Sequence, residues 1–169
     1  MDKKGVTITE LMIAVGIILL IASIASLIYI RGYRQWRQQS IQTEVQQEAR
    51  IALDNMVRNL QEAKASTVSI TYYTGQSPTL YYSKITFENV NGYDFEYYQL
   101  RDELHQRKDD GTGWKEYQIT KNVKNLYFYY PDTSRSDLIG INVTIEKAAY
   151  EGTVRTVQLT GKAVQIRNQ

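Results

Sequence analysis

Few residues in this chain could carry out chemistry, and the most unusual of them is an acid. The 169 residues include a single histidine, His105, and no cysteine. Cysteine nucleophiles, disulfides and thiolate metal sites are therefore excluded, and His105 has no nucleophilic partner at a recognisable spacing. Glu10 directly precedes the uncharged run Leu11–Ile30. A carboxylate costs about 2.5 to 3.5 kcal/mol at the centre of a membrane, so an acid at the start of this run needs a specific reason.

The other candidate groups are expected to be structural. The sequence Asp109-Asp110-Gly111 resembles the start of a calcium loop, but the later acidic positions and the closing glutamate of an EF-hand do not follow. We expect a solvated turn there and an exposed or hairpin-edge position for His105. Gly111 and Gly113 lack the lysine and serine that complete a phosphate-binding loop. The chain is therefore not expected to be an enzyme, and neither a cofactor nor a metal is predicted.

Net charge and aromatic content favour a half-wet antiparallel sheet. The formal net charge is +2, and 14 tyrosines stand against 3 phenylalanines. Adjacent residues of a strand point to opposite faces, so each tyrosine pair should place one ring in the core and one outside. An outer tyrosine surface near basic side chains could alternatively bind a partner subunit, or single-stranded DNA by stacking. The tyrosine pairs are Tyr72-Tyr73, Tyr81-Tyr82, Tyr97-Tyr98 and Tyr129-Tyr130, and the basic residues are Arg101, Arg107 and Lys108.

The run Leu11–Ile30 has the length of a membrane-spanning helix. About 20 apolar residues cross a hydrocarbon core of roughly 30 Å, and a small residue such as Gly16 permits close helix contact. One interpretation is a secretory signal cut after Ala25, which Glu10 and the apolar residues beyond the cut oppose. A second is a generic single-pass anchor. Because three arginines follow the run within residues 31–37, charge counting would place the C-terminal side of such an anchor in the cytoplasm.

A third interpretation accounts for Glu10 together with a nearby glycine. After Lys3 and Lys4 the sequence reads Gly5-Val6-Thr7-Ile8-Thr9-Glu10 and then enters the apolar run. This pattern resembles the N-terminus of type IV prepilins and pseudopilins. In that family a short basic leader ends in glycine, and glutamate is the fifth residue after it. Glycine has no Cβ, which lets a peptidase approach the backbone closely.

The resemblance implies a processed subunit of a filament. A membrane-embedded prepilin peptidase would cut between Gly5 and Val6, and the new amine of Val6 would be N-methylated. Glu10 would then pair with the N-terminal amine of a neighbouring subunit, as an assembly contact. The implied partners are other pilin or pseudopilin subunits, the peptidase and methyltransferase, the inner-membrane assembly platform and membrane lipid. The head would lie outside the cytoplasm, on a single-pass protein of the bacterial inner membrane that later joins a pilus or pseudopilus.

A looser likeness points to a subgroup. Residues Ala49–Leu60, the pair Asn122-Val123 before Leu126–Tyr130, and the closing Arg167-Asn168 resemble the minor pseudopilin J and PilW-like group. The likeness implies a minor subunit at or near the tip of a type II secretion pseudopilus or a type IV pilus. Two alternatives stay open, a DNA-uptake or adhesion minor pilin whose head binds DNA or a surface, and a generic membrane-anchored binding domain.

Helical periodicity continues beyond the apolar run and then changes to strands. Apolar residues recur every three or four positions up to about Lys64, which predicts one helix over 6–64 with a dry stripe that packs on a sheet. The fold predicted is α+β and pilin-like: leader 1–5, membrane half 6–30, amphipathic stalk 31–64 and antiparallel head 65–169. The stripe is Ile41, Val45, Ala49, Leu53, Met56, Leu60 and Ala63. The strands expected are 66–74, 80–90, 93–104, 114–120, 126–130, 138–147 and 153–167, with a hairpin turn at Asn91-Gly92.

Overall fold

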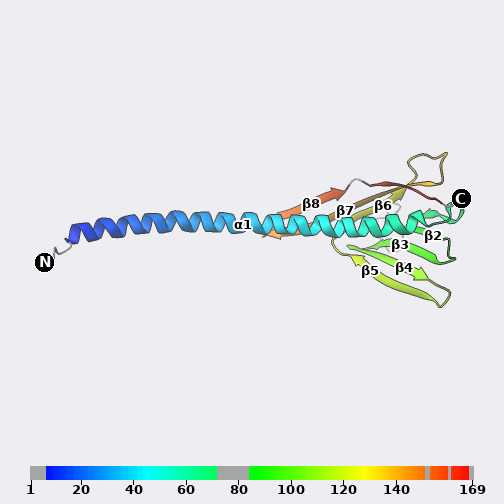
Figure 1. Ribbon diagram of the computed structural model, residues 1–169, viewed down its shortest axis with the longest axis horizontal. Helices are drawn as coiled ribbons and strands as arrows, with labels where there is room; N and C mark the ends of the chain where they lie inside the picture. Colours follow the sequence, from blue (N-terminus) through cyan, green and yellow to red (C-terminus); the bar gives the residue numbers. More distant parts are fainter. Residues whose placement is uncertain (1–6, 72–83, 151–152, 160, 168–169) are drawn as a thin grey trace. The chain divides into compact units, whose positions relative to one another are not determined.

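A computed structural model describes residues 7–71, 84–150, 153–159 and 161–167 of the chain. It divides into two compact units, Met1–Ser40 and Ile41–Gln169. Helix α1, Ile8–Gln61, begins in the first unit and continues into the second (Figure 1). The helix and the antiparallel strands that follow it confirm the predicted α+β class. The predicted cleavage position at Gly5 and Val6 lies outside the described residues.

The second unit holds two antiparallel sheets. A five-stranded sheet has the order β1-β2-β3-β4-β5, and in a four-stranded sheet β7 pairs with β6 along one edge and with β8 and β9 along the other. A short 3-10 helix, η1 (Ala65–Thr67), joins α1 to β1. The strands are β1 Ser69–Thr71, β2 Lys84–Glu88, β3 Asp94–Leu100, β4 Glu103–Asp109, β5 Trp114–Thr120, β6 Val123–Tyr129, β7 Leu138–Tyr150, β8 Thr153–Leu159 and β9 Ala163–Gln165.

The core of the second unit lies between the C-terminal part of α1 and the two sheets. The predicted helix stripe is largely confirmed: its members from Val45 onward are buried, except Leu53, which like Ile41 is partly buried against the core. Ala52 and Val57 are buried as well, which widens the stripe. From the sheets come Ile85, Phe87, Phe95, Tyr97, Leu104, Val123, Leu126, Phe128, Ile139, Ile141, Val143, Ile145, Val164 and Ile166.

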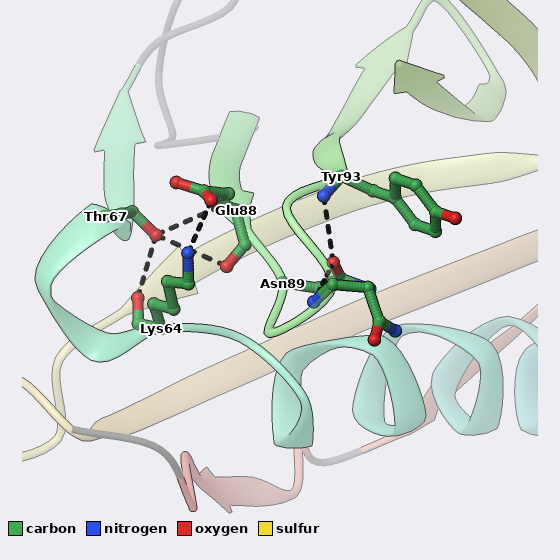
Figure 2. A network of polar contacts seen from close by, with 6 residues as sticks. Lys64, Thr67, Glu88, Asn89 and Tyr93 are labelled. Carbon is green, nitrogen blue, oxygen red and sulfur yellow. Dashed lines mark hydrogen bonds and ion pairs between the residues drawn. The ribbon is translucent and has the colours of Figure 1, made fainter. Parts of the chain in front are cut away.

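A polar network fixes the point where the helix gives way to the first sheet (Figure 2). The backbone N–H of Lys64 donates to the carbonyl of Glu88 at 2.9 Å, and the Lys64 ammonium lies 2.5 Å from the Glu88 carboxylate. The Thr67 hydroxyl donates to the Lys64 carbonyl and accepts from the Glu88 N–H. Asn89 accepts from the N–H of Tyr93 through its side chain, which closes the turn between β2 and β3. Backbone N–H groups of the next turn, and one from the C-terminal segment, pair three of the last carbonyls of the helix.

A buried glutamine joins the two sheets. The Gln99 residue is 2% exposed and sits in β3. Its Nε2 donates toward the carbonyls of Arg101, Val123 and Lys124 at 2.7, 3.0 and 3.2 Å, and its Oε1 accepts from the N–H of Leu126 at 2.8 Å. The Gln99 side chain therefore supplies hydrogen bonds to the backbone of β6, which is an edge strand of the four-stranded sheet. Unpaired backbone groups at this buried place would be costly.

A second buried polar contact sets the helix against β3. The Tyr97 hydroxyl donates to Asn55 Oδ1 at 2.6 Å and accepts from Asn59 Nδ2 at 2.5 Å. Burial raises the pKa of Tyr97 well above its ordinary value of 10.0, while the hydrogen bond from Asn59 opposes the shift. The phenol therefore stays neutral and acts as a fixed donor. Such a contact favours one rotation of the helix over others, because a slip would leave buried polar atoms unpaired.

Several predicted boundaries are corrected by the structure. The helix ends at Gln61 rather than near Lys64, where the chain forms a bridge and a 3-10 turn. The single strand expected over 93–104 is two strands, because Arg101 takes a positive φ of 56° in a tight turn. The strand expected over 153–167 is divided into β8 and β9. A Cβ at Gly161 would lie 1.3 Å from the Ile141 carbonyl oxygen, which requires glycine there.

Other predicted elements agree or need smaller changes. The strand over 114–120 is confirmed, and the Asn91-Gly92 turn is confirmed, with Gly92 at φ 80°. The strand expected over 126–130 begins earlier, at Val123, and ends at Tyr129. The strand expected over 66–74 is described only as η1 and β1. Residues 72–83, with the tyrosine pairs Tyr72-Tyr73 and Tyr81-Tyr82, lie outside the described residues.

Replacing the joining amide should destabilise the second unit. We expect Gln99→Leu to lower the free energy of unfolding of the fragment Ile41–Gln169 by about 2 to 3 kcal/mol, because the β6 backbone groups lose their partners in a buried site. Urea unfolding followed by circular dichroism measures this change. The matched control is Gln118→Leu, at an exposed position of β5, which should change stability by less than about 0.5 kcal/mol. Equal effects of the two substitutions would contradict the role assigned to Gln99.

Candidate functional site

The first turn of α1 contains a reciprocal contact between Thr7 and Glu10. The backbone N–H and the hydroxyl of Thr7 both donate to Glu10 Oε2 at 2.9 Å, and the N–H of Glu10 donates to Thr7 Oγ1 at 3.3 Å. This arrangement is a capping box, in which a threonine before the helix and a glutamate three residues later satisfy each other's amides. The acid also lies near the positive end of the helix dipole.

The capping box gives Glu10 a local role that the sequence-based interpretation did not include. The signal was present, since Thr7 and Glu10 have the threonine-x-x-glutamate spacing of this motif. The structure therefore places Glu10 where it was predicted, at the start of the apolar helix, with an intramolecular partner. Removal of residues 1–5 would retain the Thr7 amide, so the capping box is compatible with the predicted cleavage.

The apolar run that follows is exposed on every side. Hydrophobic residues from Leu11 to Ile30 keep about half or more of their surface exposed. The two serines in the run donate their hydroxyls to backbone carbonyls one turn earlier, Ser23 to Leu19 and Ser26 to Ala22. Such bonds remove polar hydrogens from a hydrocarbon environment. A Cβ placed on Gly16 would have no heavy atom within 4 Å, which leaves its surface open to another helix.

Length and composition make α1 compatible with a membrane span. Among the described residues it is the one helix that is long and apolar enough to cross a bilayer, and it lies near the N-terminus. These features weakly support single-pass anchoring, because a signal sequence has the same properties. The orientation of the helix in a membrane stays a prediction.

A second candidate region is the face of the five-stranded sheet opposite Tyr97. His105 stacks on Tyr98 with 5.4 Å between ring centroids, and the two residues are register partners on β4 and β3. Its Nδ1 lies 2.8 Å from Glu116 Oε1, and its Nε2 lies 3.1 Å from Glu103 Oε2. The side chain is 12% exposed, so the expectation of an exposed or hairpin-edge histidine is wrong. Cross-strand neighbours cover the imidazole, and single-sequence patterns do not show them.

The same face holds a nearly buried carboxylate. The Glu96 side chain is 8% exposed and lies 2.7 Å from Lys84 Nζ and 3.7 Å from Arg107 Nη1. Arg107 also stacks over the Trp114 ring at 5.0 Å from its centroid. Two cations thus surround one acid, as a buried carboxylate requires. These side chains form a network of ion pairs and a cation–π contact that links strands β2, β3, β4 and β5.

Of the tyrosine surface considered from the sequence, the structure describes the pairs Tyr97-Tyr98 and Tyr129-Tyr130. Tyr97 is in the core, but its neighbour Tyr98 is only 3% exposed although it lies on the opposite face. Arg107 and Lys108 are adjacent in β4 and therefore point to opposite faces, with Lys108 over the Tyr93 ring. Within the described part of the chain, these cations and tyrosines are not gathered on one surface. Of the last pair, Tyr129 is 38% exposed and Tyr130 is half-buried.

The loop after β4 is held by its own acids. Asp109 Oδ1 accepts from the N–H groups of Gly111 and Gly113 at 2.8 and 3.1 Å. The Asp110 carboxylate accepts from Thr112 and from the Lys115 ammonium. These bonds, first that of the Thr112 hydroxyl, hold the pKa of Asp110 well below its ordinary value. The residues described by the structure hold no group of three or more histidine, aspartate or glutamate side chains arranged for a metal ion.

Comparison with known proteins adds no family assignment. A scan against models of protein families finds no match, and a search of curated proteins finds no similar sequence. The layout itself, a long N-terminal helix followed by antiparallel sheets, is pilin-like.

The sheet face generates a pH-dependence that can be measured. The hydrogen bond from the Tyr98 hydroxyl, at 2.7 Å, and the nearby His105 hold the pKa of Glu116 below its ordinary value of 4.5. A carboxylate whose pKa is lower when folded stabilises the fold above the unfolded value and loses that contribution as the pH falls through the folded value. We therefore expect the stability of the fragment Ile41–Gln169 to decrease as the pH falls below 4.5.

Removal of the Tyr98 hydroxyl separates the contribution of Glu116 to the pH-dependence of stability from that of other acids. Tyr98→Phe should raise the pKa of Glu116 toward 4.5 and make the loss of stability in acid less steep. Carboxyl-carbon NMR titration gives the pKa, and urea unfolding at several pH values gives the stability. Tyr117→Phe, at an exposed position next to Glu116 in β5, is the matched control and should leave both unchanged. A Glu116 pKa that does not respond to Tyr98→Phe would refute the assigned cause.

Proposed function

We propose that this chain is a minor subunit of a type IV pilus or type II secretion pseudopilus. In this proposal a prepilin peptidase removes residues 1–5, Val6 is methylated, and the subunit passes from the inner membrane into a filament or its tip. The proposed partners are other pilin or pseudopilin subunits and the inner-membrane assembly platform. The head is proposed to lie outside the cytoplasm.

One observation carries the proposal. The single helix Ile8–Gln61 begins with an acid fixed in its first turn, continues through an exposed apolar run, and then buries one stripe against antiparallel sheets. An anchor needs only the apolar run. The fixed acid at its start and the continuous helix into the head are additional features, and subunits that pack their helices together would use both.

The second proposed role of Glu10 is an ion pair with the N-terminal amine of a neighbouring subunit. Only Oε2 takes part in the bonds from Thr7 described above, and a carboxylate has further lone pairs for a second donor. The capping box would hold the carboxylate in one rotamer before the neighbour arrives. An ion pair in an apolar surrounding contributes register more than net stability, since desolvation offsets much of the attraction.

Leader removal can be tested directly. In cells that co-express a prepilin peptidase, we expect mass spectrometry of the purified chain to show a methylated N-terminus at Val6. Gly5→Val should block this processing, because a side chain at that position hinders approach of the peptidase to the backbone. Gly32→Val is the matched control, since a Cβ there meets no heavy atom within 4 Å. A chain that begins at Ser26 would instead identify a secretory signal, and an unprocessed chain a generic anchor.

The charge of Glu10 can be separated from its capping role by two substitutions. Glu10→Gln keeps an oxygen for the Thr7 amide but removes the charge, whereas Thr7→Val removes the capping hydroxyl and keeps the charge. We expect Glu10→Gln and Glu10→Ala to lower incorporation into filaments by about tenfold or more, which corresponds to about 1.4 kcal/mol per contact, and Thr7→Val to have a smaller effect.

Filament recovery by shearing and immunoblotting, normalised to the processed subunit in membranes, measures incorporation. If Glu10→Gln assembles normally and Glu10→Ala does not, the acid acts through the capping box alone. That result would remove the ion pair from the proposal.

A further inference from the structure

The segment directly after the apolar run has two distinct faces. Three arginines recur at a spacing of three, which places them within about 120° around an α-helix. Three aromatic residues occupy a face about 130° away, at spacings of four and three. The arginines are Arg31, Arg34 and Arg37, and the aromatic residues are Tyr29, Tyr33 and Trp36.

The aromatic face has the character of a membrane interface. Tyr29, Tyr33 and Trp36 are 74%, 49% and 63% exposed. The rings of Tyr33 and Trp36 lie 6.3 Å apart, centroid to centroid, with their planes tilted by 36°. Rings with an apolar body and a polar edge concentrate at the level of lipid headgroups. Their place at the end of a span-length apolar run therefore locates residues 29–37 at the membrane surface.

The arginine face belongs to a segment with a positive formal charge. Between Glu10 and Glu44 the sequence contains no aspartate or glutamate, so the segment carries a formal charge of +3. All residues from Arg31 to Arg37 are exposed in the structure. A basic group of this kind beside a membrane span attracts anionic lipids. Arginine is also suited to a phosphate by geometry, because its planar guanidinium can donate two parallel hydrogen bonds.

The dimensions fit one lipid headgroup layer. At about 1.5 Å per residue, the three arginines are distributed over about 9 Å along the helix. The polar layer on each side of a bilayer is about 5 to 7 Å thick. Arginine side chains can extend along the helix toward the layer, so all three guanidinium groups can reach lipid phosphates at once.

We propose that residues 29–37 form a binding surface for anionic phospholipids on the C-terminal side of the span. The three guanidinium groups bind headgroup phosphates, and the aromatic rings lie in the interface beside them. The proposal requires only that the apolar run crosses the membrane. It does not depend on leader cleavage or on filament assembly, and it holds equally for an anchored protein that never leaves the bilayer.

Lipid selectivity next to Trp36 provides the test. The full chain with Trp114→Phe retains Trp36 as its only tryptophan. It is reconstituted in vesicles that contain phosphatidylcholine and phosphatidylglycerol in equal amounts, with one or the other lipid brominated near the top of an acyl chain. Bromine quenches tryptophan fluorescence at short range, so the ratio of the two quenching efficiencies gives the local enrichment of the anionic lipid. Each arginine near an anionic surface corresponds to about a fivefold preference.

The expected result is at least about fivefold enrichment of phosphatidylglycerol beside Trp36, which falls toward one in about 0.5 M salt because charge attraction is screened. The triple variant R31Q/R34Q/R37Q should lose the enrichment. The matched control is R50Q/R58Q/R101Q, which removes the same charge at exposed positions of the second unit and should retain it.

Each other outcome overturns the proposal in a distinguishable way. Equal quenching by both lipids in the unsubstituted chain, or enrichment that survives R31Q/R34Q/R37Q, refutes lipid binding by the arginines while the span remains. Absence of quenching by either lipid shows that the segment is not at the membrane, and this refutes the membrane stage of the proposed function as well. Enrichment lost equally in the control variant attributes the effect to overall charge and not to this surface.

Discussion

The head depends on the buried amide of Gln99. The strand β6 is the edge of its sheet, and its backbone faces the other sheet in the interior of the unit. Without a partner, the carbonyls and amides of that edge would each lose a hydrogen bond to water on folding. Gln99 can both donate and accept, so one side chain satisfies both kinds of group. The two sheets can therefore share a core with α1 although they are not hydrogen-bonded to each other as strands.

The two parts of helix α1 differ in which of their side chains are exposed and which are buried. Over Leu11–Ile30 α1 shows apolar side chains on all sides, and Ser23 and Ser26 bond to carbonyls of the helix itself. In the second unit it buries one stripe, and Asn55 and Asn59 fix its rotation through Tyr97. The contacts of Asn55 and Asn59 with Tyr97 thus lie where the helix and the sheet exclude water. In the apolar run, the two serine hydroxyls already donate hydrogen bonds to carbonyls of the helix, so they do not need a solvent partner.

The sequence predicted the elements better than their ends and side-chain partners. The helix, its buried stripe and the strand over 114–120 follow from periodicity and from glycine at the turn before Trp114. The turn at Arg101 was missed because neither glycine, proline nor asparagine marks it, and tertiary contacts hold a positive φ at an ordinary residue. The interruption at Gly161 depends on close approach to Ile141, more than a dozen residues away in sequence.

The candidate site divides in the same way. Glu10 was identified from its position in the sequence, because a charge beside an apolar run is visible without a structure. Its bond with Thr7 could also have been predicted from their spacing, whereas the enclosure of His105 by Tyr98, Glu103 and Glu116 could not. The enclosure of His105 depends on strand register, because a shift of one residue would move each side chain of the strand to the opposite face of the sheet.

The position of β5 has a consequence for crowding. It is one of the two edge strands of its sheet as described, the other being β1, and its backbone could extend the sheet of a neighbouring chain. An exposed strand edge makes uncontrolled pairing between neighbouring chains a hazard. The charged residues Lys115 and Glu116 are the second and third residues of β5, and both are exposed. Charges at such a place discourage amyloid-like growth from sheet to sheet, so heads could crowd together and still remain separate proteins.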